Sequence, residues 1–63
     1  MCLSTVYREK LDPNNIIMKN VMTIECKGQN VVLTDLMERQ ITLKAELVKA
    51  SLTDGFALVR ELQ

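Results

Sequence analysis

Apolar and polar residues alternate along several short segments of this chain, and that alternation limits its fold more than any other feature. From Ile41 to Leu47, every second residue is apolar, and the same pattern runs from Met22 to Lys27. A period of two places successive side chains on opposite faces of an extended strand. The pattern therefore predicts half-buried β-strands.

Turn signals divide the chain into five predicted strands. Pro13 and the two asparagines after it favour a turn, as do Gly28 and the sequence Thr53-Asp54-Gly55. The alternation is interrupted near Asn20, which predicts a bend or bulge inside the second strand. The predicted strands are residues 2–9, 16–27, 31–36, 41–51 and 56–62, and the predicted turns are 11–15, 28–30, 37–40 and 53–55.

Residues 35–50 carry two conflicting patterns. Asp35 followed by Glu38 resembles a helix capping box, and apolar residues recur at helical spacing from Met37 to Leu52. The period-two alternation of residues 41–47 favours a strand instead. A meander of five strands can curl on itself and remove its open edges, whereas one helix on a few strands would bury less apolar surface. We therefore predict an all-β, five-stranded barrel as a single domain, residues 1–63.

The length of the chain and one apolar stretch predict self-association. A domain of 63 residues buries a thin core and usually needs a metal, a disulfide or a partner for stability. Leu47 and Val48 are adjacent, and Ala50 and Leu52 follow, so both faces of that strand are apolar. We expect one face to be covered by a second copy, which makes the protein a homodimer.

The chain has two cysteines, Cys2 and Cys26, and no histidine. Residues 1–7 lack the positive region and the long apolar run of an export signal, so we expect a cytoplasmic protein with reduced thiols. A disulfide between the two cysteines is not expected.

Cys2 is the candidate metal ligand. Its thiolate lies beside the α-amine of Met1 and its own amide nitrogen, and this set of sulfur and nitrogen donors suits a square-planar Ni(II) ion, with Cu(II) as a competitor. The alternative is that Cys2 is a small hydrophobic residue at the start of an edge strand. Cys26 alternates with Ile24 and is predicted to be a buried structural thiol, while Met18 and Met22 are predicted to fill the core. A zinc site built from Cys2 and Cys26 of two chains is a further alternative.

Composition argues against three classes of function. Eight basic residues balance eight acidic ones without forming a run, and the only aromatic residues are Tyr7 and Phe56, which is a poor inventory for nucleic-acid binding. No apolar run approaches the roughly 18 residues of a membrane-spanning helix. Without histidine, or a nucleophile beside a base, catalysis has no support, and we expect no enzyme. Six acids are read as surface: Glu9, Asp12, Glu25, Glu38, Glu46 and Glu61.

The whole chain resembles the CooT family. The resemblance is carried by the opening Met1-Cys2-Leu3-Ser4-Thr5-Val6-Tyr7, the length, the glycine turn after a long second strand, and Thr53-Asp54-Gly55 before an acidic last strand. CooT proteins are small nickel-binding accessory proteins associated with maturation of carbon monoxide dehydrogenase. The resemblance implies an SH3-like or Sm-like β-barrel that acts as a homodimer, with nickel held at the paired amino termini. The resemblance implies a functional role for Met1 and Cys2 only.

The donor count agrees with a site shared by two chains. One chain offers at most three good donors, whereas two chains related by a two-fold axis can each give a thiolate and a nitrogen. That nitrogen is the Cys2 amide if Met1 is retained, or the Cys2 amine if Met1 is removed. The sequence thus predicts a nickel metallochaperone or nickel store. The alternative is an SH3-like or Sm-like module that binds protein or RNA and has no metal role.

Overall fold

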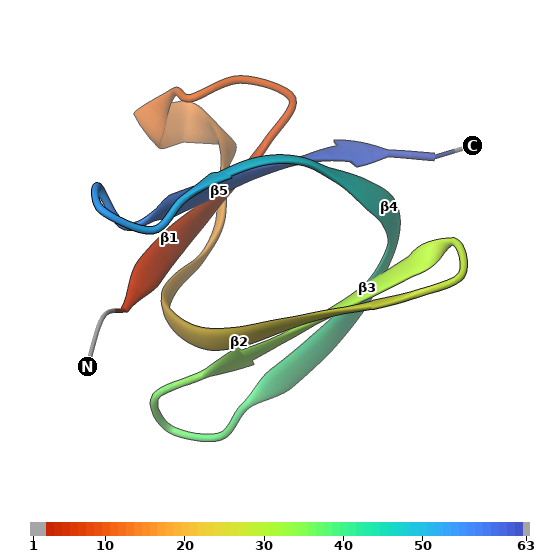
Figure 1. The fold of residues 1–63 in the computed structure, drawn as a ribbon, viewed down its shortest axis with the longest axis horizontal. Helices are drawn as coiled ribbons and strands as arrows, with labels where there is room; N and C mark the ends of the chain where they lie inside the picture. Colours follow the sequence, from red (N-terminus) through yellow and green to blue (C-terminus); the bar gives the residue numbers. More distant parts are fainter. Residues whose placement is uncertain (1–2, 63) are drawn as a thin grey trace.

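The computed structural model describes residues 3–62, which form five strands in one closed sheet (Figure 1). The order around the ring is β1-β2-β3-β4-β5, with β5 returning to β1. The elements are β1 (Ser4–Arg8), the 3-10 helix η1 (Pro13–Asn15), β2 (Ile16–Lys27), β3 (Asn30–Asp35), β4 (Gln40–Ser51) and β5 (Phe56–Glu61). The predicted all-β fold is confirmed, including a strand over residues 41–51. No helix in this described range is long and apolar enough to cross a membrane.

The two long strands, β2 and β4, each pair with two neighbours. β2 pairs with β1 up to Val21 and with β3 from Val21 to Lys27. β4 pairs with β3 up to Lys44 and with β5 from Ala45 onward. These pairings are antiparallel, and only β5 meets β1 in parallel. Residues 40–51 are therefore not helical, because their backbone groups form hydrogen bonds with β3 and then with β5.

The core is small and almost entirely aliphatic. Leu33 and Val59 are completely buried and come from β3 and β5, which lie on opposite sides of β4. The half-buried side chains of Ile17, Met18 and Ile24 pack against it from β2. The buried hydrophobic residues are Val6, Val21, Val31, Leu33, Ala45, Ala57 and Val59.

A bulge in β2 changes the phase of its alternation. Val21 pairs with Asp35 but Thr23 pairs with Thr34, so Met22 is an extra residue on this strand. Asn20, two residues before Met22, has a φ of 57°, in the left-handed region that Asn tolerates. The predicted bend near Asn20 is confirmed. Met22 is 37% exposed, so its prediction as core filler is wrong, whereas Met18 packs against the core as predicted.

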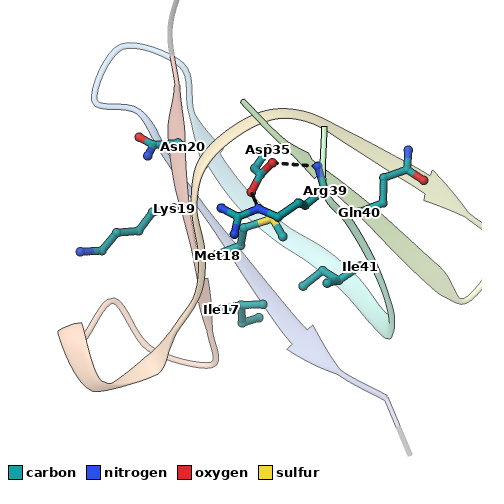
Figure 2. A pocket seen from close by; sticks show the side chains of 8 residues that line it. All are labelled: Ile17, Met18, Lys19, Asn20, Asp35, Arg39, Gln40 and Ile41. Carbon is teal, nitrogen blue, oxygen red and sulfur yellow. Dashed lines mark hydrogen bonds and ion pairs between the residues drawn. The ribbon is translucent and has the colours of Figure 1, made fainter. Parts of the chain in front are cut away.

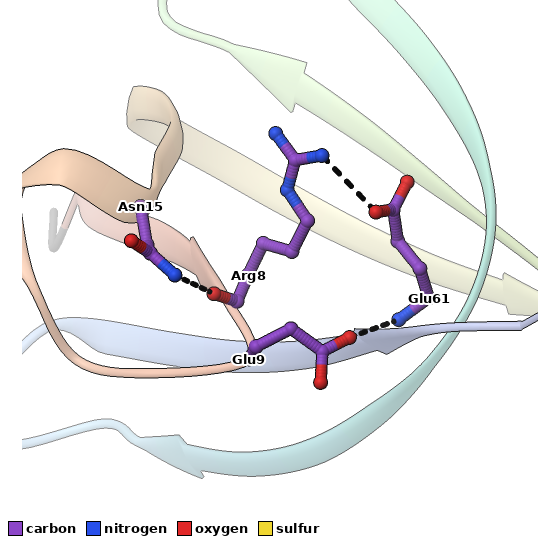
Figure 3. A network of polar contacts seen from close by, with 4 residues as sticks. All are labelled: Arg8, Glu9, Asn15 and Glu61. Carbon is purple, nitrogen blue, oxygen red and sulfur yellow. Dashed lines mark hydrogen bonds and ion pairs between the residues drawn. The ribbon is translucent and has the colours of Figure 1, made fainter.

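Polar contacts hold the end of β1 to the end of β5 (Figure 3). Arg8 Nη1 donates to Glu61 Oε1 at 3.0 Å, and the Glu61 amide donates to Glu9 Oε2 at 3.0 Å. Asn15, at the end of η1, donates to the Arg8 carbonyl at 2.7 Å. Glu9 and Glu61 are exposed, as predicted. The exposed ion pair between Arg8 and Glu61 contributes about 0.2–1 kcal/mol. Two of these contacts join the end of β1 to β5, and the third ties η1 to the end of β1.

Candidate functional site

The predicted metal-binding residues, Met1 and Cys2, lie outside the described residues. The structure does fix the point from which they lead. Leu3 is half-buried, and its carbonyl oxygen lies only 3.2 Å from where a Cβ on residue 55 would be. The Thr5 amide donates to the Gly55 carbonyl at 3.0 Å. Gly55 thus lets the start of β1 lie directly against the turn between β4 and β5.

That turn is built by hydrogen bonds to Ser51. The Gly55 amide donates to the Ser51 carbonyl at 2.9 Å, and the Asp54 amide donates to Ser51 Oγ at 3.1 Å. Gly55 has a φ of 75°, a conformation that residues with a Cβ rarely adopt. Glycine is therefore required twice at this position, by its backbone angle and by the nearness of Leu3. The predicted hairpin signal at Thr53-Asp54-Gly55 is confirmed.

Cys26 is exposed, so the prediction of a buried structural thiol is wrong. Its register partner Val31 is buried, which shows that Cys26 does belong to the core-facing side of β2. Beyond Val21, however, β2 pairs only with β3, and the described chain places no strand along its other edge. The alternation thus predicted the face of Cys26 correctly, but no part of residues 3–62 covers its side chain enough to bury it. Within residues 3–62, no group of three or more His, Cys, Asp or Glu side chains could hold a metal ion.

Asp35 is the one charged residue among the buried side chains of residues 3–62, with 2% of its surface exposed. It ends β3 and organises the turn that leads to β4. Its Oδ1 accepts hydrogen bonds from the amides of Met37 and Arg39, both at 2.9 Å, and its Oδ2 accepts one from Arg39 Nε at 2.8 Å. The Asp35 amide donates in turn to the Arg39 carbonyl at 3.0 Å. In the sequence pattern, Asp35 stood out only as a candidate helix cap.

The ionised form of Asp35 is favoured despite its burial. Loss of hydration opposes ionisation and by itself raises the pKa of this carboxyl group. The hydrogen bonds from the Arg39 amide and side chain, the positive charge of Arg39 and the Met37 amide together outweigh that effect, so the pKa of Asp35 is lower than its ordinary value. The carboxylate is therefore a fixed negative charge that orients Arg39.

A pocket of about 540 Å³ opens beside this pair (Figure 2). Arg39 and Met18 both line this pocket, and Figure 2 shows the Arg39 side chain extending from the β3–β4 turn to its partner Asp35. The side chains of Ile17 and Ile41 lie on the side of the pocket away from Asp35. The lining residues are Ile17, Met18, Lys19, Asn20, Asp35, Arg39, Gln40 and Ile41. Sequence reasoning missed this pocket; the one available signal was an aspartate at the end of an alternating strand, followed by arginine four residues later.

Large apolar side chains are exposed along the second half of β4 and the turn after it. Leu47 is 39% exposed, Val48 52% and Leu52 82%. A shift in the register with β5 between Leu47 and Lys49 makes Val48 an extra residue in this strand. The bulge interrupts the regular alternation of this strand between Leu47 and Lys49. These three residues are called the β4 apolar surface below.

Comparison with known proteins places the chain in a family. No curated protein matches its sequence significantly. The fold is similar to the crystal structure of a protein assigned as CooT from Carboxydothermus hydrogenoformans, with a TM-score of 0.84 over 98% of this chain and 100% of the other, at 14% sequence identity. The family model for CooT, described as the CO dehydrogenase accessory protein, matches residues 1–59. The match spans nearly all of the sequence, including Met1 and Cys2, and the chain belongs to the CooT family of CO dehydrogenase accessory proteins.

Proposed function

We propose that this chain is a cytoplasmic, homodimeric nickel-binding protein that buffers or delivers Ni(II) during maturation of a nickel enzyme such as carbon monoxide dehydrogenase. The ion is cargo and is held at the paired amino termini. Each chain contributes the Cys2 thiolate and one nitrogen, which is the Cys2 amide if Met1 is retained or the Cys2 amine if Met1 is removed. The observation that carries the proposal is the family match, which extends over Met1 and Cys2.

The structure fixes the residue that follows Cys2 in the sequence, Leu3. The Leu3 carbonyl is packed at Gly55, in the turn that also contains the exposed Leu52. Leu3 is therefore held beside the turn that contains Leu52. Pairing two copies through this surface is compatible with bringing two amino termini together.

The donor chemistry supports nickel over harder ions. Thiolate and nitrogen donors in a plane stabilise Ni(II), whereas Mg²⁺ and Ca²⁺ prefer oxygen ligands. Both donors must lose a proton before they bind the ion, so the affinity is expected to fall as the pH decreases. We also propose that the closed sheet is of the SH3-like or Sm-like type. A small closed sheet of this kind is a suitable carrier for a terminal site.

A nickel titration tests the proposal directly. The native protein is expected to bind one Ni(II) per two chains as a diamagnetic centre with sulfur-to-nickel charge-transfer absorption. Cys2→Ser is expected to abolish this absorption and leave the circular dichroism spectrum unchanged. Cys26→Ser is the matched control and is expected to bind nickel as the native protein does. Loss in Cys26→Ser with retention in Cys2→Ser would place the site elsewhere and overturn the proposal.

Two further measurements separate the alternatives. An amino-terminal extension is expected to weaken or rearrange binding if the nitrogen donor is the terminal amine. A tetrahedral Co(II) spectrum that is lost in either cysteine variant would favour the zinc site built from Cys2 and Cys26. If the native protein and both cysteine variants bind no metal, the alternative of an interaction module without a metal role replaces the nickel proposal.

A further inference from the structure

The pocket between the bend of β2 and the β3–β4 turn has the features of a ligand site. Its volume of about 540 Å³ is within the range of roughly 300–1,000 Å³ found for small-molecule pockets. Its residues divide into aliphatic side chains, Ile17 and Ile41 with Met18, and polar side chains around them, among them Lys19 and Arg39.

Arg39 is held in place with part of its hydrogen-bonding capacity unused. Asp35 binds Nε of Arg39 at 2.8 Å, and the carboxylate itself is fixed by the amides of Met37 and Arg39. Within residues 3–62, the hydrogen bond and the ion pair of this guanidinium group both use Nε, which leaves its two terminal nitrogens without an acceptor. The Arg39 side chain is 74% exposed although its partner Asp35 is only 3% exposed. The buried carboxylate thus orients a guanidinium group whose outer donors are open to a ligand.

The charges around the pocket favour a ligand with a single negative charge. Lys19 and Arg39 are positive and Asp35 is negative, which leaves one net positive charge among the lining residues. Two parallel N–H donors of a guanidinium group match the two oxygens of a carboxylate. The Asp35 carboxylate, whose Oδ2 lies 2.8 Å from Arg39 Nε, would repel a doubly charged phosphate more strongly than a singly charged carboxylate. The aliphatic side chains of Ile17 and Ile41 would contact an apolar body attached to the charged group.

We propose that this pocket binds an aliphatic carboxylate, with the carboxylate on the outer nitrogens of Arg39 and the aliphatic part against Ile17, Met18 and Ile41. This chemistry has two sources, a free branched aliphatic acid or the carboxyl terminus of a polypeptide that ends in an aliphatic residue. In either case Asp35 is a positioning residue, because it acts by orienting Arg39. The proposal does not depend on nickel binding.

Binding is tested by NMR titration of the full-length, isotope-labelled protein with 4-methylpentanoate at constant ionic strength and neutral pH. We expect saturable shifts at the amides of Lys19, Asn20, Arg39 and Gln40, with a dissociation constant on the order of 1 mM for a ligand of this size. The neutral analogue 4-methylpentanamide and inorganic phosphate are each expected to bind at least about tenfold more weakly than 4-methylpentanoate. Equal affinity for the amide, or shifts that map outside the pocket, would overturn the proposal.

Variants of the two basic residues assign the contact. Arg39→Lys keeps a positive charge near Asp35 but lacks the planar pair of donors, so binding is expected to weaken about tenfold. Lys19→Gln leaves the Asp35 hydrogen bonds intact and is expected to weaken binding about twofold to threefold. The Lys19→Gln variant keeps the test decisive if the Arg39→Lys protein does not fold. Lys44→Gln, on β4 outside the pocket, is the matched control, and an equal effect of Lys44→Gln and Lys19→Gln would contradict a local site.

Peptides distinguish the two sources of the carboxylate. Acetyl-Ala-Leu with a free terminal carboxylate is compared with 4-methylpentanoate and with the same peptide carrying a terminal amide. Tighter binding of the acidic peptide than of the free acid supports a polypeptide terminus, and the reverse order supports a small acid. Binding of the peptide amide as tight as that of the acidic peptide would overturn the role of Arg39. The Cys2→Ser protein is expected to give the same results, so failure of this proposal and failure of the nickel proposal are separately visible.

Discussion

The Asp35 carboxylate accepts hydrogen bonds from both the amide and the Nε of Arg39, at 2.9 Å and 2.8 Å, across the four-residue step that connects β3 to β4. One side chain therefore closes the turn and orients the guanidinium group beside the pocket. Because Asp35 is buried and Arg39 is exposed, the pair places a positive charge at the surface over a fixed negative one.

Asp35→Asn is expected to lower the stability of the fold at neutral pH. The substitution retains the shape of the side chain but removes the charge from an acceptor of three hydrogen bonds. Urea unfolding of the native and variant proteins at pH 7 measures the difference in midpoint. Asp54→Asn, in the β4–β5 turn, is the control and is expected to change the midpoint little. Equal midpoints for the native protein and Asp35→Asn would show that the carboxylate is not needed for the turn.

The stability contributed by Asp35 is expected to depend on pH. The pKa of Asp35 in the folded chain is lower than its ordinary value, which is about 3.9 in an unfolded chain. The contribution is therefore complete above about pH 4 and is lost as the pH falls through the folded-state pKa. Unfolding measured from pH 7 down to strongly acidic pH should show the native protein and Asp35→Asn converging in acid. A constant difference between the two proteins over this range would contradict the assignment.

Gly55→Ala is expected to destabilise the protein more than Gly28→Ala. Both glycines have positive φ angles, 75° and 59°, and placing a residue with a Cβ there costs about 1–2 kcal/mol. Only at Gly55 would the added Cβ also approach another group, the Leu3 carbonyl at 3.2 Å, whereas nothing lies within 4 Å at Gly28. The free energy of unfolding of each variant, measured with urea, is the test. A larger loss for Gly28→Ala would show that the start of β1 is not held at Gly55.

Val48→Glu is expected to disrupt the proposed dimer without unfolding the chain. Val48 is 52% exposed, so a carboxylate there remains hydrated in the monomer but is buried when two β4 apolar surfaces meet. Sedimentation equilibrium is expected to give twice the 7.2 kDa chain mass for the native protein and the chain mass itself for the variant. Lys49→Glu, the next residue along β4, is the matched control and is expected to remain dimeric. A native protein that is monomeric at micromolar concentration would contradict the dimer.

The thiol of Cys26 is expected to react rapidly with iodoacetamide in the folded protein. Cys26 is exposed, and in the described part of the chain β3 is the one strand beside it. A Cys2→Ser background isolates the reaction at Cys26, and mass spectrometry follows its rate with and without urea. Similar rates in both conditions are expected. Protection that is removed by urea would mean that Cys26 is covered, for example by a second copy of the chain.

The strands themselves could be predicted from particular residues. The alternation of residues 41–47 predicted β4, and Gly28 and Gly55 marked the turns on either side of β3 and β4. These signals are local, because the period of two and the tolerance of glycine for positive φ act over a few residues. The interruption at Asn20 likewise predicted the bend in β2, although it did not show where the extra residue lies.

The sequence by itself thus determined five strands, their turns and the family that the first residues indicate. The tertiary structure alone decided the exposure of Cys26, the displacement of Met22 by the bulge and the burial of Asp35. Exposure depends on whether another strand covers a given stretch, and β1 leaves β2 before Cys26 is reached. The environment of Asp35 depends on a turn that folds back onto its carboxylate, and only the three-dimensional path of the chain brings those donors together.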